Sequence, residues 1–322
     1  MNTFKELKIA LGNEIKDGPW GGGNQFLISF KKYFEGKGAC VVHHLEDGLD
    51  VIILINPRPE SGTFTHKDIK KYKKSNPRVK VIHRVNETDR AKNTCHIDRL
   101  RLEANKVADA VVFISEWVQQ YYRQRGMDPR TPAYVAHNGP DESIFHHDGY
   151  RPWQDSGPMK IVTHHWSNNP MKGIDVYDYF DKLLEDSWMQ SRFQFTYIGR
   201  YPAGTEFRHT RTVPPLSGAD LARELRSHHV YLTAARWESC GMHQLEGACC
   251  GLPVLYINEG GGVVETCREA GIEHTAGSFP VALFKMRDQY ARLQPKMKTF
   301  PFNASAMCRQ YESVLQSVLN SD

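Results

Sequence analysis

The feature that most constrains this chain is an alternation of short apolar runs with helical segments, which the sequence contains twice. In the first half, β-rich apolar runs are separated by segments with the apolar spacing of an amphipathic helix. Parallel strands need a long crossover between them, and a helix is its usual form. The alternation therefore predicts a parallel sheet wrapped by helices. The predicted strands are residues 9–11, 40–42, 51–55, 79–82, 110–114 and 133–136, and the predicted helices include 25–34, 97–107 and 117–125.

The same alternation restarts in the second half of the chain. In open α/β sheets, ligands bind beyond the carboxyl ends of the strands. The residues that follow each strand are therefore the first candidates for a functional site. The predicted strands here are residues 160–163, 193–198, 230–233 and 254–257, and the predicted helices are 174–184, 219–227 and 242–250.

A polar segment rich in glycine and proline separates the two halves. It reads Gly149-Tyr-Arg-Pro-Trp-Gln-Asp-Ser-Gly-Pro158 and has no apolar periodicity, which is typical of a linker. The chain of 322 residues is also longer than one core usually organises. We therefore predict two doubly wound domains, residues 1–150 and 151–302, with a hinge between about residues 149 and 157. An amphipathic terminal helix, residues 303–322, is expected to brace the N-terminal domain.

Composition excludes several classes of protein. No run approaches the roughly 18 apolar residues that a membrane span needs. The start of the chain lacks the apolar segment and cleavage site of a signal peptide, so we expect a cytoplasmic protein. Seven cysteines without a CxxC pair argue against a disulfide framework or a zinc knuckle. Fifteen histidines show neither HxxxH nor HExxH spacing, so we expect no structural or catalytic metal.

Positive charge is concentrated in one segment, although the net charge of +4 is too small to indicate a dedicated nucleic-acid protein. Between Lys67 and Lys80 the chain has seven Lys and Arg residues against the single acid Asp68. One interpretation is a solvated helix face. The other is contact with an anionic surface, either a peripheral membrane surface or DNA.

The motif with the most chemical content follows the third predicted strand of the second half. Glu238 lies in the loop after that strand, and Glu246 lies seven intervening residues later, inside a helix that begins near Gly241. The first backbone N–H groups of such a helix, those of Gly241 and Met242, point beyond its N-terminus and favour a phosphate. The two carboxylates are thus placed to bracket a diphosphate and to accept hydrogen bonds from sugar hydroxyls. Gly261, in the glycine run after the next strand, would let the backbone approach the same ligand.

This stretch resembles the EX7E motif of the retaining glycosyltransferases of family 4, followed in both by Cys-Gly-Leu-Pro-Val and Gly-Gly-x-x-Glu. Three further passages resemble that family in the same order, and together they cover most of the chain. The resemblance implies the GT-B fold, with two Rossmann-like domains that face each other across a cleft. It also implies a retaining hexosyl- or pentosyltransferase that works without a metal. The three passages are Gly21–Gly23, Ser115-Glu116 with His137-Asn-Gly-Pro-Asp141 and Phe145, and Lys172-Gly173.

The resemblance implies a role for each matching residue. Glu238 would hold hydroxyls of the transferred sugar, and Glu246 would hold the ribose hydroxyls of the nucleotide. Lys172 would neutralise the diphosphate leaving group, and fixed charges of this kind stabilise it without a metal. The leaving phosphate would take the proton of the acceptor. The co-substrate would be a UDP- or GDP-sugar, with no cofactor, and the acceptor a hydroxyl of a glycan or glycolipid. Backbone N–H groups would assist Lys172 at Gly22, Gly23, Gly241 and Met242.

The sequence departs from the family pattern at two places. The family usually has an arginine about five residues before the Lys-Gly pair, where this chain has Ser167. His165, Arg200 and Arg84 are the candidates for the missing positive charge. The family often places a histidine near the acceptor after an N-domain strand. His83 is the candidate for that role, and Arg84 beside it is the alternative.

Three other functions remain open from the sequence. A sugar transferase that acts on a modified nucleobase in DNA would use the Lys67–Lys80 run against the phosphate backbone. A sugar-nucleotide epimerase of related two-domain fold would also carry paired acids, but the Asn138-Gly139 and Lys172-Gly173 passages favour transfer. A sugar-binding lectin would lack a phosphate site, and Lys172 with the glycine loops argues against it. No stable protein partner is implied.

Overall fold

The computed structural model describes residues 4–18 and 21–321, and these residues form two compact units. Of the described residues, unit 1 comprises 4–17, 22–138 and 304–321, and unit 2 comprises 18, 21 and 139–303. Each unit contains a six-stranded sheet in which every strand pair is parallel. The predicted α/β fold with two wound sheets is therefore confirmed. Among the described helices, none has the length and apolar character needed to cross a membrane.

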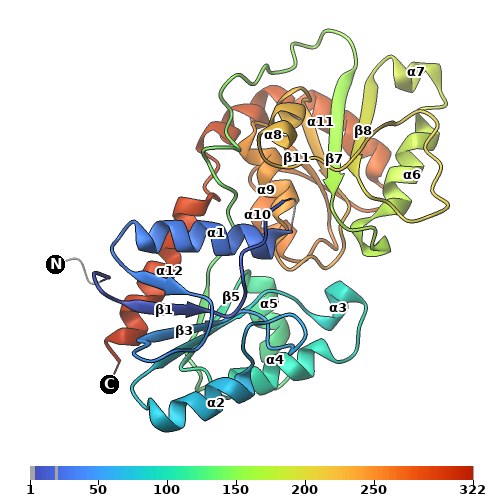
Figure 1. Cartoon of the computed structure of the whole chain (residues 1–322). Coiled ribbons are helices and arrows are strands. Elements are labelled where there is room, and N and C mark those ends of the chain that lie inside the picture. Colours follow the sequence, from blue (N-terminus) through green and yellow to red (C-terminus); the bar gives the residue numbers. More distant parts are fainter. Residues whose placement is uncertain (1–3, 19–20, 322) are drawn as a thin grey trace. The chain divides into compact units, whose positions relative to one another are not determined.

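The sheet of unit 1 has the strand order β2-β1-β3-β4-β5-β6. Helices α1 and α12 cover one face of this sheet, and α2 and α4 cover the other (Figure 1). The strands are β1 (Lys8–Leu11), β2 (Cys40–Val42), β3 (Val51–Leu54), β4 (Lys80–Val85), β5 (Ala110–Phe113) and β6 (Ala133–Val135). The helices are α1 (Gly22–Glu35), α2 (His66–Ser75), α3 (Asp89–Lys92), α4 (Ile97–Asn105), α5 (Glu116–Arg123) and α12 (Ala304–Leu319).

The apolar pattern explains why these segments fold together. All four residues of β3 are buried, as expected for a strand covered on both faces. Helix α1 buries Phe26, Phe30 and Phe34, which are four residues apart and so share one face. The ring of Tyr311 from α12 lies 5.1 Å from that of Phe26, centroid to centroid. The last helix thus completes the core of unit 1.

The sheet of unit 2 has the strand order β12-β11-β10-β7-β8-β9. Helices α6 and α11 cover one face, and α8, α9 and α10 cover the other. The strands are β7 (Met159–His165), β8 (Phe193–Gly199), β9 (Arg211–Val213), β10 (Val230–Thr233), β11 (Val254–Ile257) and β12 (Gly271–His274). The helices are η1 (Pro170–Lys172), α6 (Ile174–Leu183), α7 (Ser187–Gln190), α8 (Gly218–Arg226), α9 (Met242–Cys249), α10 (Gly262–Cys267), α11 (Phe279–Leu293) and η2 (Gln294–Thr299).

The strand order in unit 2 defines where a ligand is expected. β7 lies between β8, the next strand in sequence, and β10, so the connections run in opposite directions from β7. Doubly wound sheets bind ligands beyond the carboxyl ends of the strands at such a switch point. The residues that follow β7 and β10 therefore occupy the expected place in unit 2.

Most predicted strands and helices are present, with ends shifted by at most three residues. Shifts of three residues occur at the start of α1, at the end of α12 and at the end of β4, which continues to Val85. His83 and Arg84 are polar, yet both are buried inside the strand, so the pattern of apolar residues ended too early. The sequence analysis did not predict the short edge strand β9 or the last strand β12, and it missed α11.

Candidate functional site

The loop before α6 fixes the position of Lys172 in unit 2. The side chain of Asn169 accepts a hydrogen bond from the backbone N–H of Met171, which starts the single turn η1. Gly173 then adopts a left-handed conformation with φ of 87°. A Cβ atom there would lie 2.3 Å from the carbonyl oxygen of Ala234, just after β10, so only glycine fits. Lys172 is therefore held at the carboxyl end of β10 by a steric constraint.

Lys172 and Glu238 meet at this point. Their side chains form an ion pair between Nζ and Oε2, and they remain 24% and 22% exposed. The Glu238 loop is held from its other side by the segment before α10. The N–H of Gly262 donates to the carbonyl of Glu238 at 2.8 Å, and Gly261 has a positive φ of 66°. A Cβ at Gly261 would lie 2.8 Å from that carbonyl oxygen, so this glycine permits the close approach.

Glu246 is paired with a histidine that the sequence analysis did not select. His164, near the end of β7, places Nε2 at 2.7 Å from Oε2 of Glu246, and both residues are buried. The hydroxyl of Tyr231 lies 3.1 Å from Nδ1 of His164 and also accepts its backbone N–H. An ionised carboxylate can only accept a hydrogen bond, so Nε2 is the donor to Glu246 and Nδ1 is left to accept from the hydroxyl of Tyr231. Nε2 then carries the imidazole proton and donates it to the carboxylate.

The N-terminus of α9 is the third component of the site. Gly241 is the N-cap residue, and no side chain of the described residues caps the helix. Gln244, in the first turn, is fully buried. Within the described part of the chain, neither polar atom of its amide has a hydrogen-bond partner. Buried polar groups are normally paired, so this amide, beside the first backbone N–H groups of α9, is available to bind a polar ligand.

His165 does not supply the positive charge that was expected in place of the family arginine. Its Nε2 lies 2.8 Å from the hydroxyl of Tyr177, and its ring lies 4.9 Å from that of His243. Burial, followed by the charge of His243 and of Lys172, lowers the pKa of His165 well below its usual range. The imidazole is therefore neutral at pH 7. The physical reason is that both sides of the ring are packed inside unit 2, away from water.

Arg200 remains a candidate for that charge in unit 2. It follows β8, and its backbone N–H donates to the carbonyl of His165 at 3.0 Å. Its guanidinium carbon lies 4.2 Å from the centroid of the Trp166 ring, the distance of a cation–π contact. The side chain is exposed. Arg84, the other candidate, belongs to unit 1.

His83 and Arg84 point to opposite faces of the sheet in unit 1, and both are fully buried. Nδ1 of His83 donates to the side-chain carbonyl of Asn105 at 2.6 Å, and burial lowers the pKa of His83 to about 3. Arg84 donates to the side-chain oxygen of Asn138 at 2.8 Å and stacks on Phe26 at 4.1 Å. A contact of either residue with an acceptor stays a prediction, and their burial does not favour it.

Gly22 and Gly23 begin helix α1. A Cβ atom at Gly23, or at the preceding Gly21, would meet no atom within 4 Å. Packing among the described residues therefore does not explain why glycine occupies positions 21 and 23. The expected contact of Gly22 and Gly23 with a donor diphosphate stays a prediction.

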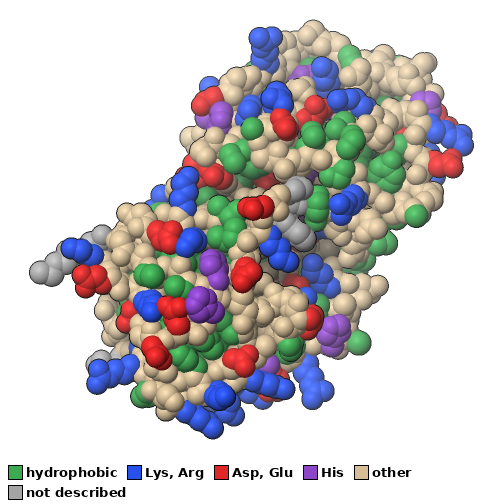
Figure 2. Space-filling view, viewed as in Figure 1, with side chains coloured by type: hydrophobic (Ala, Val, Ile, Leu, Met, Phe, Trp, Pro, Cys, Tyr) green, Lys and Arg blue, Asp and Glu red, His purple; other side chains and the backbone are tan. Residues whose placement is uncertain are grey.

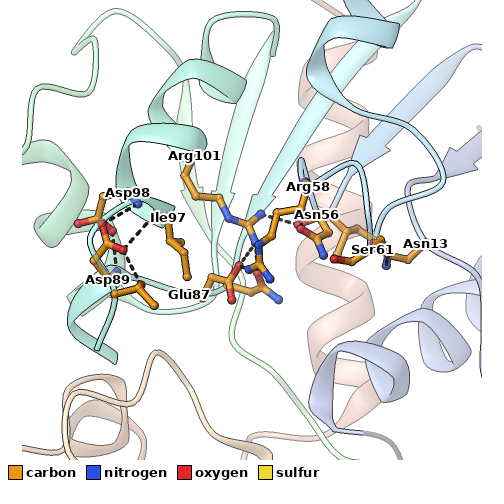
Figure 3. Close-up of polar contacts among 12 residues, drawn as sticks. Asn13, Asn56, Arg58, Ser61, Glu87, Asp89, Ile97, Asp98 and Arg101 are labelled. Atoms are coloured by element: carbon orange, nitrogen blue, oxygen red, sulfur yellow. Dashed lines mark hydrogen bonds and ion pairs between the residues drawn. The ribbon is translucent and has the colours of Figure 1, made fainter. Parts of the chain in front are cut away.

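A second polar cluster, which the sequence analysis did not identify, lies at the carboxyl ends of β3 and β4 in unit 1 (Figure 3). Arg101 from α4 donates to Oε1 of Glu87 at 2.6 Å, and Arg58 contacts the same oxygen atom. Each of the three residues follows or faces a strand end. No short motif joins them, because Arg58 and Glu87 are 29 residues apart in sequence.

Comparisons with known proteins identify the fold. No protein-family model and no curated protein sequence matches the chain. Among solved structures, sucrose-phosphate synthase from Thermosynechococcus elongatus aligns over 98% of this chain and 100% of its own, with 14% identity and a TM-score of 0.71. HepE from Anabaena, in complex with UDP and glucose, aligns over 97% and 100%, with 13% identity and a TM-score of 0.67.

A third similar structure is an alpha-glucosyltransferase in complex with UDP and a 13-mer DNA containing an A:G mismatch. It aligns over 97% of this chain and 99% of its own, with 11% identity and a TM-score of 0.61. At such low identity the likeness concerns the fold alone. The two parallel sheets and their flanking helices match those of glycosyltransferases, and the chain has the α/β two-domain fold of the GT-B class.

Proposed function

We propose that this protein is a retaining glycosyltransferase that moves a hexosyl or pentosyl group from a nucleotide-diphosphate sugar to a hydroxyl of a glycan or glycolipid. One observation carries the proposal. The Lys172–Glu238 pair, the His164–Glu246 pair and the N-terminus of α9 meet at the carboxyl ends of β7 and β10. That is the switch point at which such sheets bind ligands. Similar folds with bound UDP and UDP-glucose support it.

The His164–Glu246 pair suits the ribose of the nucleotide. The imidazole occupies Oε2 of Glu246, which leaves Oε1 to accept hydrogen bonds from a ribose hydroxyl. The hydrogen bond from His164 to Oε2 fixes the orientation of the carboxylate that would bind the hydroxyls. His164 therefore acts on the ligand through Glu246 and is a positioning residue.

The Lys172–Glu238 pair suits the diphosphate and the sugar. Before a donor binds, each side chain neutralises the other. A diphosphate carries more negative charge than one carboxylate, so it attracts Lys172 more strongly than Glu238 does. Lys172 and the first N–H groups of α9 then bind the diphosphate. The carboxylate of Glu238 is released to accept hydrogen bonds from the hydroxyls of the sugar.

In the proposed reaction, the bond between the anomeric carbon and the phosphate oxygen breaks. The acceptor oxygen bonds to the same face of the anomeric carbon, and its proton passes to the oxygen of the leaving phosphate. Lys172 and the α9 N–H groups stabilise the charge that develops on that phosphate. The reaction requires neither a protein nucleophile nor a metal ion.

The test is a nucleotide screen followed by a transfer assay. We expect UDP or GDP, but not CMP, to stabilise the protein by about 2.7 kcal/mol at a concentration of 100 Kd. Lys172→Ala should weaken this binding, whereas Lys182→Ala, at an exposed lysine paired with Asp178, should not. The transfer assay should give a product with the anomeric configuration of the donor. If none of the five nucleotides tested (UDP, GDP, ADP, dTDP and CMP) stabilises the protein, the proposal is overturned.

The same assay tests metal independence and stereochemistry. Transfer should continue undiminished in EDTA, because Lys172 and backbone N–H groups supply the positive charge. An activity that EDTA abolishes and Mn²⁺ restores would contradict the metal-free mechanism. A product of inverted anomeric configuration, seen by NMR, would contradict the retaining mechanism while leaving sugar transfer intact.

The basic face of α2 favours a second candidate acceptor, a nucleobase in DNA. This face consists of Lys67, Lys70, Lys71 and Lys74, which are all exposed. Figure 2 shows Lys and Arg side chains along the edge of unit 1 where Figure 1 places α2. The alpha-glucosyltransferase of similar fold was solved with DNA. The same face also suits an anionic membrane that carries a glycolipid acceptor.

A further inference from the structure

Two arginines share one carboxylate in the second polar cluster. Arg101 is 1% exposed, and its guanidinium donates to Glu87, to Asn86 and to the backbone carbonyl of Ile55. Nε2 of the neutral His83 lies 3.4 Å from its Nη1 as a further acceptor. A buried charge of this kind is tolerated only when it is paired and hydrogen-bonded. Glu87 therefore balances Arg101.

The charge of Arg58 is then left without a full counter-charge. Its side chain is 25% exposed and touches the same Oε1 of Glu87 through Nη2. Among residues 4–18 and 21–321, its Nε and Nη1 donors have no hydrogen-bond partner. Burial, followed by the charge of Arg101, lowers the pKa of Arg58. The exposed Glu60 opposes this shift only weakly and forms no ion pair with Arg58. The group of two arginines and one carboxylate thus has a net charge of +1.

The loop that carries Arg58 is rigidly built. The backbone N–H of Arg58 donates to the side-chain oxygen of Asn56. The backbone N–H groups of Ser61 and Gly62 donate to the backbone carbonyl of Arg58. The amide of Asn13, after β1, donates to the carbonyl of Ser61 at 2.7 Å. A ligand that binds a fixed guanidinium avoids the entropy cost of ordering it.

Glu87 is held equally firmly from the other side. The hydroxyl of Tyr122 donates to its backbone carbonyl at 2.9 Å. The next residue, Thr88, caps α3, and the carboxylate of Asp89 accepts the N–H groups of Ile97 and Asp98. Figure 3 shows the two guanidinium groups converging on Glu87 between these anchored segments. The cluster is thus a preformed site.

We propose that Arg58 binds an anionic group of the acceptor, a phosphate or a carboxylate, so that the acceptor is an anionic sugar or alcohol. This inference rests on the proposed glycosyl transfer. The guanidinium fork matches both oxyanions geometrically. The site lies at the carboxyl ends of β3 and β4, the edge where α/β sheets bind ligands. Partial burial makes the attraction stronger than that of the fully exposed lysines on α2.

Glu87 has an unusual place in this site, because it competes with the ligand for Arg58. Removing its charge should free both guanidinium groups and tighten anion binding. Loss of a merely structural contact would weaken anion binding instead, so the sign of the effect on binding separates the two roles.

The first experiment measures inorganic phosphate binding by calorimetry on the full chain with UDP at saturation, which keeps phosphate out of the nucleotide site. We expect Arg58→Gln to weaken phosphate binding at least tenfold and Arg58→Lys to weaken it less. Glu87→Gln should tighten it at least threefold. Arg130→Gln is the matched control, since Arg130 is an exposed arginine of unit 1 paired with Asp128. Wild-type UDP affinity and a cooperative thermal transition in each variant confirm that it is folded.

The second experiment compares acceptors that differ only in charge. With the donor found in the nucleotide screen, transfer is measured to glucose 6-phosphate, glucuronic acid and methyl glucoside. Arg58→Gln should raise the KM for the preferred anionic acceptor at least tenfold and leave the KM for methyl glucoside unchanged. A preference for glucose 6-phosphate identifies the anion as a phosphate, and a preference for glucuronic acid identifies it as a carboxylate.

The outcomes separate this inference from the proposed function. If Arg58→Gln binds phosphate as the wild type does while UDP still binds, the anion site is wrong and the transferase proposal stands. If Glu87→Gln folds but weakens phosphate binding, the competition between Glu87 and the ligand is wrong, and the site with it. If no nucleotide binds but phosphate binding depends on Arg58, the transferase proposal fails and the anion site remains.

Discussion

Each glutamate at the two polar clusters is paired with a lysine, a histidine or two arginines. Lys172 holds Glu238, His164 holds Glu246, and two arginines hold Glu87. Removing one partner leaves the other side chain unpaired and partly buried. The loss of affinity or activity measured in a variant therefore includes the cost of that unpaired group. Single substitutions therefore report on pairs and do not isolate one side chain.

The first prediction concerns Lys172 and Glu238. Lys172→Ala and Glu238→Ala should each lower kcat/KM by about a hundredfold or more, because each removes a group that stabilises charge or holds the sugar. The double variant should lose less than the product of the two single losses, since the residues act as a pair. Initial rates with the identified donor measure all three. A loss below tenfold in both single variants would remove these residues from the site.

The second prediction concerns the nucleotide. Glu246→Ala should weaken UDP or GDP binding with little direct effect on the chemical step. His164→Ala should weaken it about tenfold, the equivalent of one charge-assisted hydrogen bond. His164→Gln should lose less nucleotide affinity than His164→Ala, because the amide N–H of glutamine can replace the Nε2–H donor. Calorimetry measures the dissociation constants, with His147→Gln at an exposed histidine as the control. An unchanged constant in His164→Ala would contradict the positioning role.

The candidate site residues that the sequence indicated are those whose spacing is local. Glu238 and Glu246 are separated by a fixed interval, and Lys172 precedes a glycine in a recognisable pair. His164 could not be found in this way, because its partner Glu246 is 82 residues distant and becomes a neighbour only when α9 packs beside β7. Arg58 lies in an Asn-Pro-Arg-Pro loop that has the pattern of an ordinary turn.

The third prediction tests the turn between η1 and α6. Gly173→Ala should lower the free energy of unfolding by about 2 kcal/mol or more, because the new Cβ meets the Ala234 carbonyl in addition to the left-handed strain. Gly204→Ala is the matched control. Gly204 also has a positive φ, of 85°, but open space around it, so about 1 kcal/mol is expected. If urea unfolding shows that Gly173→Ala and Gly204→Ala lower the free energy of unfolding equally, the backbone at Gly173 is not packed tightly against the Ala234 carbonyl.

The fourth prediction tests the basic face of α2. Replacing Lys67, Lys70, Lys71 and Lys74 by Gln should weaken acceptor use and leave nucleotide affinity unchanged. Lys73 is kept, because it pairs with Asp109 and supports the fold. Added salt should reduce acceptor use by the wild type more than by the variant, because salt screens the attraction between the lysines and an anionic acceptor. Binding to double-stranded DNA and to anionic liposomes, measured side by side, distinguishes the two acceptor classes. If the variant transfers sugar normally and the wild type binds neither DNA nor liposomes, this face of α2 is only solvated and does not bind the acceptor.

Several helices and the central strands were predictable, because those helices have an amphipathic period and the strands are continuous apolar runs. β10 and β11 have the predicted bounds, and every residue in them is buried. The edge strand β9 is different, since Arg-Thr-Val has two exposed residues and forms a strand only by pairing with β8. Such pairing depends on tertiary context, which local sequence does not contain.

The fifth prediction concerns stability against pH. Burial lowers the pKa of His83 to about 3 and the pKa values of His228 and His274 to about 4. The unfolded chain binds these protons near pH 6.5, so below that pH it binds more protons than the folded protein does. The free energy of unfolding should therefore fall as pH decreases from about 6.5 toward 4. The loss at pH 5 is at most about 2 kcal/mol for each group.

Urea unfolding at pH 7 and pH 5 measures this loss. His274→Phe should make it smaller, because the substitution removes one buried titratable group that already packs on Phe279. Equal stability of the wild type at the two pH values would show that these histidines are not held neutral by burial.

Helix α12 completes the core of unit 1, yet it follows all of unit 2 in the sequence. On the ribosome, unit 1 emerges first but lacks α12 until residues 139–303 have been made. The apolar surface of α1 that faces Tyr311 stays uncovered throughout that time. Unit 2, which is continuous from residue 139, can finish folding earlier. The part of the chain that is synthesised first is therefore the last to mature, and chaperones have their longest opportunity to bind it at α1.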